Sequence, residues 1–183
     1  MDLALLILRV VVGALFVGHG AQKLFGVWGG HGLAGTAGFF EQIGLKPGRI
    51  HAPAAGGAEL VGGLLLVLGL LTPIGSALII AVMVAAALTV HLPNGLWATE
   101  NGIELNLVYA ATAVALAGVG AGEISLDNAF GLDLSGTGWA LGALGLGIIG
   151  GVGAVLSGRM VAGRTTATAP ATAEQHQRVD SLS

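Results

Sequence analysis

Several ionisable and amide side chains lie inside stretches of this chain that are otherwise apolar. They are His19 and Lys23 in the first stretch, Glu59 in the second, His91 at the end of the third, and Glu104 and Asn106 at the start of the fourth. A charge at bilayer depth costs roughly 2.5–3.5 kcal/mol on insertion scales, so such residues normally face a protein interior or a water-filled cavity. Histidine and glutamate can move protons there, and lysine and asparagine can donate hydrogen bonds.

The composition of the chain is that of an integral membrane protein. Of its 183 residues, 54% are hydrophobic and only 9% are charged, and the mean hydropathy is +0.86, whereas a soluble domain carries about 25% charged residues. The net charge of −3 is small and argues against nucleic acid as a partner. The chain has no cysteine, so it forms no disulfide and offers no thiolate nucleophile or cysteine-held iron–sulfur cluster. Any thiol chemistry that it serves must come from another protein.

Five apolar segments have the length needed to cross a bilayer, which is about 20 residues. They run from about Leu3 to Phe25, Pro53 to Leu71, Ile74 to Leu92, Ile103 to Ala121 and Gly138 to Leu156. We therefore predict an all-α integral membrane fold. Residues 1–128 form a four-helix transmembrane bundle, residues 129–158 add a fifth transmembrane helix, and the polar residues 159–183 form a disordered tail.

The fifth segment carries glycines at four-residue spacing, namely Gly138 with Gly142 and Gly147 with Gly151. Small residues at this spacing let two helices approach closely in lipid, so the segment is expected to pack on another helix. The alternative is that these glycines only reflect a chain that contains 33 of them.

The basic residues outside the segments predict an orientation in the membrane. They are Lys46, Arg49, Arg159, Arg164 and Arg178. With five spans these residues fall on one side, and the positive-inside rule places that side in the cytoplasm. We therefore expect a multi-pass protein of a bacterial inner membrane, with the N-terminus and the acidic connection over residues 122–137 outside and the C-terminal tail in the cytoplasm.

Counting residues from the segment ends places the candidate residues near one membrane face. His19 lies six residues before Phe25, and Glu59 lies six residues after Pro53, which is about 9 Å of helix in each case. One loop joins these two ends, so both side chains lie near the same face. The other candidates at segment ends on this face are Lys23, His91, Glu104 and Asn106. Arg9 lies toward the opposite face.

Two interpretations of this cluster remain open. In a structural one, Lys23 and the histidines neutralise Glu59 and Glu104 and fix the register of the helices, while residues at helix ends extend to the headgroups. In a functional one, the cluster forms a polar pocket that binds a small polar head group or passes protons. No single helix carries ligands at a suitable spacing, so no metal is expected.

The chain also resembles a known family, the DoxX family of small membrane proteins. The resemblance is carried by GHGAQKLFG at 18–26, GTAGFFE at 35–41, GLKPG at 44–48, AELVGGLL at 58–65, residues 83–91, GIELNL at 102–107 and SLD at 125–127. It covers roughly residues 5–128 in the order of the family. The fifth segment and the tail exceed the four-helix core that is common in the family.

This resemblance implies a function. Some relatives are membrane subunits of a thiosulfate:quinone oxidoreductase, and others are linked to complexes with a superoxide dismutase and a sulfurtransferase that protect against oxidative stress. The implied motif residues are the six that the depth argument selects, and a quinone head group would suit their donors and proton-carrying groups. We thus expect the lipid-embedded subunit of a quinone-linked redox complex. The alternatives are a scaffold that recruits soluble redox enzymes and a small-solute or proton-coupled transporter. Catalytic residues and oligomeric state stay open.

Overall fold

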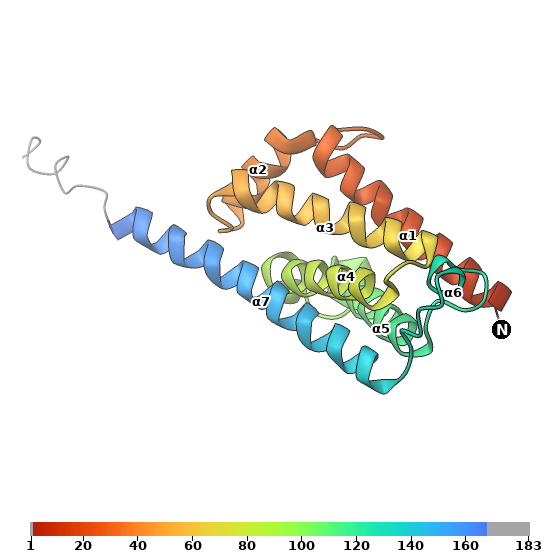
Figure 1. The fold of residues 1–183 in the computed structure, drawn as a ribbon. Coiled ribbons are helices and arrows are strands. Elements are labelled where there is room, and N and C mark those ends of the chain that lie inside the picture. The colour runs from red at the N-terminus through yellow and green to blue at the C-terminus, as the bar shows by residue number, and fades with distance from the viewer. Residues whose placement is uncertain (1, 168–183) are drawn as a thin grey trace, which may run out of the picture.

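A computed structural model describes the fold of residues 2–167, and its regular elements in that range are all helices (Figure 1). The five long helices are α1 (Asp2–Phe25), α3 (Gly48–Leu68), α4 (Thr72–Ala86), α5 (Glu104–Val119) and α7 (Thr137–Ala167). The connections hold α2 (Gly32–Gln42) and the short α6 (Leu126–Ala129). At its end α4 continues as a π-helix (Ala87–His91) and a 3-10 turn (Leu92–Asn94), and a second 3-10 turn (Ala98–Glu100) precedes α5.

The helices form a bundle with α4 at its centre. α1 and α3 lie side by side, and α4 packs against α3, α5 and α7 (Figure 1). The core between them contains buried side chains from all five long helices, among them Phe16, Leu66, Ile79, Leu116 and Ala143. The central position of α4 is why its end can contribute to a site shared with α1, α3 and α5.

Glycines allow the close contact between α1 and α3. A Cβ atom at Gly13 would lie 2.6 Å from the carbonyl oxygen of Gly63, and one at Gly20 would lie 2.6 Å from the backbone nitrogen of Leu60. Both distances are below any ordinary contact, so only glycine fits at these positions. This contact holds the two helices that carry Lys23 and Glu59 in register.

The membrane fold predicted from the sequence is confirmed. α1, α3, α7 and the segment Thr72–Asn94 are each long and apolar enough to cross a bilayer. The fourth predicted segment is shorter than expected, because α5 has 16 residues instead of the range Ile103–Ala121. Large apolar side chains such as Val11, Leu141 and Ile149 are exposed on the outer surface, where a bilayer would cover them.

Other details differ from the predictions. The second segment begins at Gly48 rather than Pro53, so the proline lies inside α3. α7 continues to Ala167, and residues 159–167, assigned to the disordered tail, are therefore helical. The remainder of that tail, 168–183, lies outside the described residues.

Only one of the two glycine pairs in the fifth segment packs against another helix. Cβ atoms at Gly147 and Gly151 would collide with Ile80, Ala81 and Val84 of α4, so these two glycines seat α7 on α4. Nothing lies within 4 Å of a Cβ at the earlier pair, Gly138 and Gly142.

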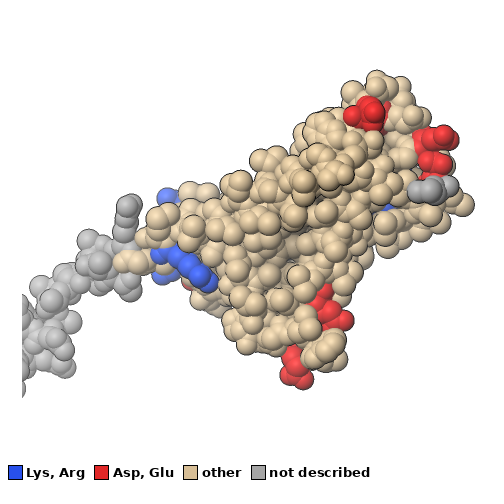
Figure 2. Space-filling view, turned by 90° about the horizontal axis from the view of Figure 1, so that it is seen from below, with Lys and Arg blue, Asp and Glu red and all other residues tan. Residues whose placement is uncertain are grey.

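Basic side chains gather at one end of the bundle. Figure 2 shows them at the end where the chain leaves α7, with acidic side chains elsewhere on this face. Arg159 of α7 donates a hydrogen bond of 3.3 Å to the carbonyl oxygen of Leu88. The acidic connection with Glu123 and Asp133 follows α5, at the opposite end.

Candidate functional site

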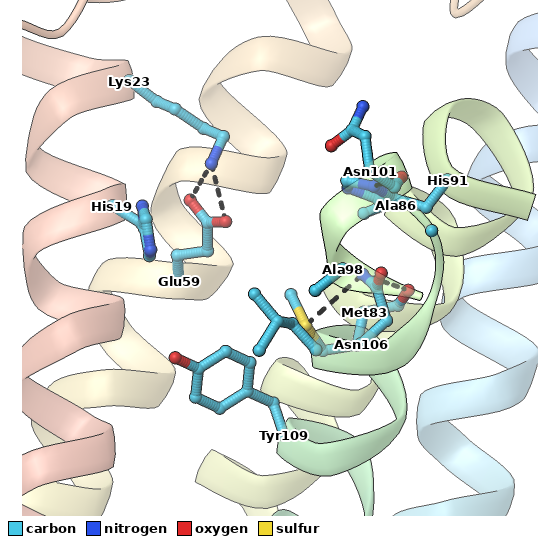
Figure 3. A pocket seen from close by; sticks show the side chains of 12 residues that line it. His19, Lys23, Glu59, Met83, Ala86, His91, Ala98, Asn101, Asn106 and Tyr109 are labelled. Carbon is cyan, nitrogen blue, oxygen red and sulfur yellow. Dashed lines mark hydrogen bonds and ion pairs between the residues drawn. The ribbon is translucent and has the colours of Figure 1, made fainter. Parts of the chain in front are cut away.

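The centre of the site is an ion pair between α1 and α3. The Lys23 ammonium donates to both carboxylate oxygens of Glu59, with Nζ–O distances of 2.7 and 2.6 Å (Figure 3). The Glu59 side chain is only 4% exposed, whereas that of Lys23 is 28% exposed. The carboxylate therefore depends on the lysine for charge compensation, and an ammonium with three N–H donors keeps one of them for another acceptor.

A polar cavity of about 240 Å³ borders this pair. Five of the six residues predicted from the sequence line it: His19, Lys23, Glu59, His91 and Asn106. The other lining residues are Met83, Ala86, Ala98, Asn101, Gly102, Leu105 and Tyr109. The structure thus brings together side chains from α1, α3, α4 and α5, as counting along the segments indicated.

On the α1 side of the polar cavity, His19 lies beside Glu59 (Figure 3). Its ring is held edge-on against Phe16, with 6.3 Å between ring centroids. Phe16 makes a second edge-on contact, of 5.2 Å, with Tyr109 of α5. The aromatic contacts place a histidine and a tyrosine on the same cavity wall.

On the α4 side, His91 ends the π-helix. Its Nδ1 lies 2.8 Å from the carbonyl oxygen of Asn101. A carbonyl oxygen can only accept, so Nδ1 carries the proton and Nε2 is the acceptor when the ring is neutral. π-Helical turns inside α-helices often mark functional sites, and this one sets the position of a cavity-lining histidine.

Asn106 and Glu104 lie on different faces of α5. The Asn106 amide nitrogen is 3.4 Å from the carbonyl oxygen of Met83 and 3.7 Å from its sulfur. Glu104 does not line the cavity, and its carboxylate instead accepts a hydrogen bond of 2.7 Å from the Ala98 N–H. Two residues correspond to about 200° around a helix, so the prediction, which considered depth alone, was wrong to group Glu104 with Asn106.

Sequence reasoning missed two polar residues of this cavity. Tyr109 lies three residues after Asn106, a spacing that puts both on one face of a helix, and it is the one tyrosine in the sequence. This spacing could have identified it. Asn101 reaches the cavity because of the way the loop before α5 folds, and no pattern in the sequence indicates that loop conformation.

Arg9 belongs to a different cluster at the opposite end of the bundle. Its fully buried guanidinium donates to the carbonyl oxygens of Leu66, at 3.2 Å, and Ile124, at 2.6 Å. Gly69 adopts a left-handed conformation beside it, and a Cβ atom there would collide with the guanidinium. Arg9 thus ties α1 to the end of α3 and to the connection after α5.

Asp127 completes this second cluster. Its buried carboxylate accepts hydrogen bonds from the N–H of Leu71 (2.7 Å), the N–H of Thr72 (3.1 Å) and the Thr72 hydroxyl (2.8 Å). These donors open α4, so Asp127 caps that helix from a distant part of the chain. The SLD motif at 125–127 is thereby given a structural role.

Residues 4–92 match the DoxX family profile. The Bacillus subtilis (strain 168) protein named "Putative oxidoreductase CatD" is 32% identical over 126 residues, which is 69% of this chain and 86% of that protein. The chain belongs to the DoxX family.

Two Haemophilus influenzae proteins, each named "Uncharacterized protein", are also similar to this DoxX protein. One is 36% identical over 85 residues, covering 46% of this chain and 56% of its own length, and the other is 31% identical over 130 residues, covering 67% and 87%. No solved structure gives a significant match. The family profile ends at residue 92, so α5 and α7 of this DoxX protein lie beyond the matched part.

Proposed function

We propose that this DoxX protein is the quinone-binding membrane subunit of a redox complex, with the quinone head group in the polar cavity. The observation that carries the proposal is the buried Lys23–Glu59 pair at the wall of a cavity shared by four helices. Burying an ion pair costs desolvation energy, and binding of a ligand in the adjacent cavity gives a functional reason for the pair to be there.

The residues present fit such a head group. When bound, a quinone supplies an acceptor for two electrons and two protons. Its ring carbonyls require hydrogen-bond donors, which the third Lys23 N–H and the Asn106 amide can provide. Glu59, His19 and His91 are groups that can take up and release protons near the ring. Tyr109 and Met83 give the cavity apolar and aromatic surface.

Protons can reach these groups from the aqueous face. A second cavity, of about 250 Å³, shares His19 and Lys23 with the first, and its other lining residues include the polar Gln22, His31 and Thr36 and the aromatic Phe39 and Phe40. It lies under the connection between α1 and α2. This arrangement gives His19 a position between water and Glu59.

The electrons must come from a partner, because this cysteine-free chain offers no thiol of its own. The name of the Bacillus subtilis relative supports an oxidoreductase role. We expect soluble enzymes of sulfur or thiol oxidation or of oxidative-stress protection, such as a sulfurtransferase or a superoxide dismutase, to dock at the membrane surface. The donor would be a reduced sulfur compound that gives up two electrons per quinone.

Binding of a quinone analogue tests the proposal. Decylubiquinone would be titrated into nanodisc-embedded wild-type protein and followed by quenching of its tryptophans. Glu59→Gln and His19→Ala should each weaken binding about tenfold, or about 1.4 kcal/mol. Glu123→Gln, an exposed residue at the opposite end, is the matched control and should bind as wild type. Unchanged binding in both cavity variants would show that the proposal is wrong.

The same proposal places the protein in the bacterial cell membrane with its basic end in the cytoplasm. Because the chain has no cysteine, single cysteines report accessibility without background. An impermeant maleimide should label Ser135→Cys in intact cells, and Gln42→Cys only after permeabilisation. Both positions are exposed and carry no charge, so the substitutions leave the charge distribution unchanged. The reverse labelling pattern would overturn the orientation.

A further inference from the structure

A further cavity, beside the polar one, is apolar and larger than the two cavities described above. This apolar groove has a volume of about 450 Å³, within the roughly 300–1,000 Å³ that is typical of small-molecule sites. Its walls come mainly from α3, α4 and α7 and include Ala55 and Ala58 of α3, Ala81 and Ala85 of α4, and Gly150 and Ala154 of α7. Lys23 of α1 and Phe39 and Phe40 of α2 also line it. α3 and α7 thus face one another across α4, and most of the residues that these three helices contribute to the groove are alanine or glycine.

The groove meets the polar cavity at the ion pair. Lys23, Glu59, Ala86 and His91 line both spaces. The other end reaches the outer surface, since the groove is also lined by Phe39, which is 44% exposed. The groove therefore adjoins the charged and hydrogen-bonding cavity at one end, with the ion pair at their common wall.

We propose that the apolar groove admits and holds the isoprenoid tail of the quinone, and that α7 is the wall that makes it a tail site. This inference rests on the proposed function, because it assumes that the head lies in the polar cavity. That cavity, at about 240 Å³, accommodates a head group but no long chain. The second cavity is lined by Phe39 and Phe40 but also by Gln22, His31 and Thr36, so a hydrocarbon chain there would lie partly against polar groups.

The groove gives the quinone tail a place to lie while the head is bound, and it adds little to the affinity for the quinone. Lipid tails are as apolar as a leucine side chain, so moving a tail from the bilayer into the groove gains little free energy. A blocked groove would nevertheless keep a tailed molecule from placing its head beside Lys23. The physical signature of the tail site is therefore a substitution that excludes tailed ligands and leaves tail-less ones unaffected.

The neighbouring positions on α7 provide the matched variants. Ala154 is half-buried and lines the groove, whereas Gly153 is exposed and a Cβ atom there would meet nothing within 4 Å. Ala154→Phe would fill the groove, and Gly153→Phe would place the same side chain in lipid. Ala58→Phe fills the groove from the opposite wall and carries the test should Ala154→Phe fail to fold, as judged by its unfolding temperature.

Binding of two probes in nanodiscs decides the question. The probes are decylubiquinone and the same ring without the decyl chain, and each variant is compared with wild type on one probe at a time, so that partitioning into the bilayer cancels. Ala154→Phe and Ala58→Phe should weaken decylubiquinone binding about tenfold, equal to about 1.4 kcal/mol, and leave the tail-less probe unchanged. Gly153→Phe should leave both unchanged.

Three outcomes would overturn the tail site while leaving the proposed function intact. The first is unchanged decylubiquinone binding in the groove variants. The second is an equal loss for both probes, which would place the effect on the head group site. The third is a phospholipid found on the purified protein by native mass spectrometry that Ala154→Phe displaces without changing quinone binding. A wild-type protein that binds neither probe would instead refute the proposed function itself.

Discussion

The Lys23–Glu59 pair allows the structural and functional interpretations of the site to be separated by a double-mutant cycle. Removing one partner of a buried ion pair costs about 3–5 kcal/mol, because the other charge is left without compensation. For Lys23→Met we expect a loss of about 3 kcal/mol, the lower end of that range, since water in the adjoining cavity can solvate part of the carboxylate. Glu59→Gln should cost less, about 1–2 kcal/mol. The reason is that Lys23, 28% exposed, can extend to water.

The double variant Lys23→Met/Glu59→Gln carries no unpaired charge and should lie within about 1 kcal/mol of wild type, as other apolar replacements of buried ion pairs do. The coupling energy is then about 3–5 kcal/mol. Unfolding would be followed in mixed micelles by circular dichroism. At about 2–4 °C per kcal/mol for a chain of this size, Lys23→Met lowers Tm by about 6–12 °C and the double variant nearly restores it.

Quinone binding gives the second measurement on the same proteins. If the pair is there to bind a head group, the double variant is stable and does not bind decylubiquinone. A stable double variant that binds as wild type would refute the functional interpretation. A Lys23→Met protein as stable as wild type would show that the pair is not needed to hold α1 and α3 together.

Three further predictions concern other positions. Asp127→Ala removes three hydrogen bonds to the start of α4 and should lower the free energy of unfolding by about 3 kcal/mol. Asp133→Ala, an exposed control, should change it by less than about 0.5 kcal/mol. Equal effects of the two substitutions would contradict the capping role of Asp127. Gly20→Leu should separate α1 from α3 and lower the free energy of unfolding by at least about 1–3 kcal/mol. Gly18→Leu is the control, because nothing lies within 4 Å of a Cβ atom at that position, and it should leave the stability unchanged. Thermal unfolding of the two variants makes the comparison. Tyr109→Phe should keep the Tm of the wild type and weaken quinone binding, and an unchanged dissociation constant would remove the hydroxyl from the site.

Much of the site was predictable because the rise of a helix is fixed. Counting from Phe25 and Pro53 put His19 and Glu59 at one depth, and both residues do line one cavity. The count from the start of α3 was nevertheless too short, because that helix begins at Gly48 and not at Pro53. What counting along a helix cannot supply is rotation about its axis. Glu104 was wrongly grouped with Asn106 for that reason.

Other features depend on tertiary contacts that leave no local pattern. The π-helix that ends at His91 is held by the loop around Asn101, and the cap of α4 comes from Asp127, more than 50 residues away. The apolar groove requires α7 to lie across α4 opposite α3. Small residues on each helix indicate that something packs closely, but not whether a helix or a ligand fills the space.

The two charged clusters of this DoxX protein differ in a way that favours a ligand at one of them. At the Asp127 end, the carboxylate accepts three hydrogen bonds and the two terminal nitrogens of Arg9 each donate one, all within the protein itself, and only the buried Arg9 Nε lacks a partner among the described residues. At the Lys23 end, Lys23 lines three cavities and Glu59 lines two of them, whereas Asp127 lines one. There His91 Nε2 and the Asn106 amide oxygen accept no hydrogen bond from the described part of the chain. A cluster that only joins helices would resemble the first. The unused donors and acceptors of the second are groups that a bound head group can satisfy, and the apolar groove adjoins them.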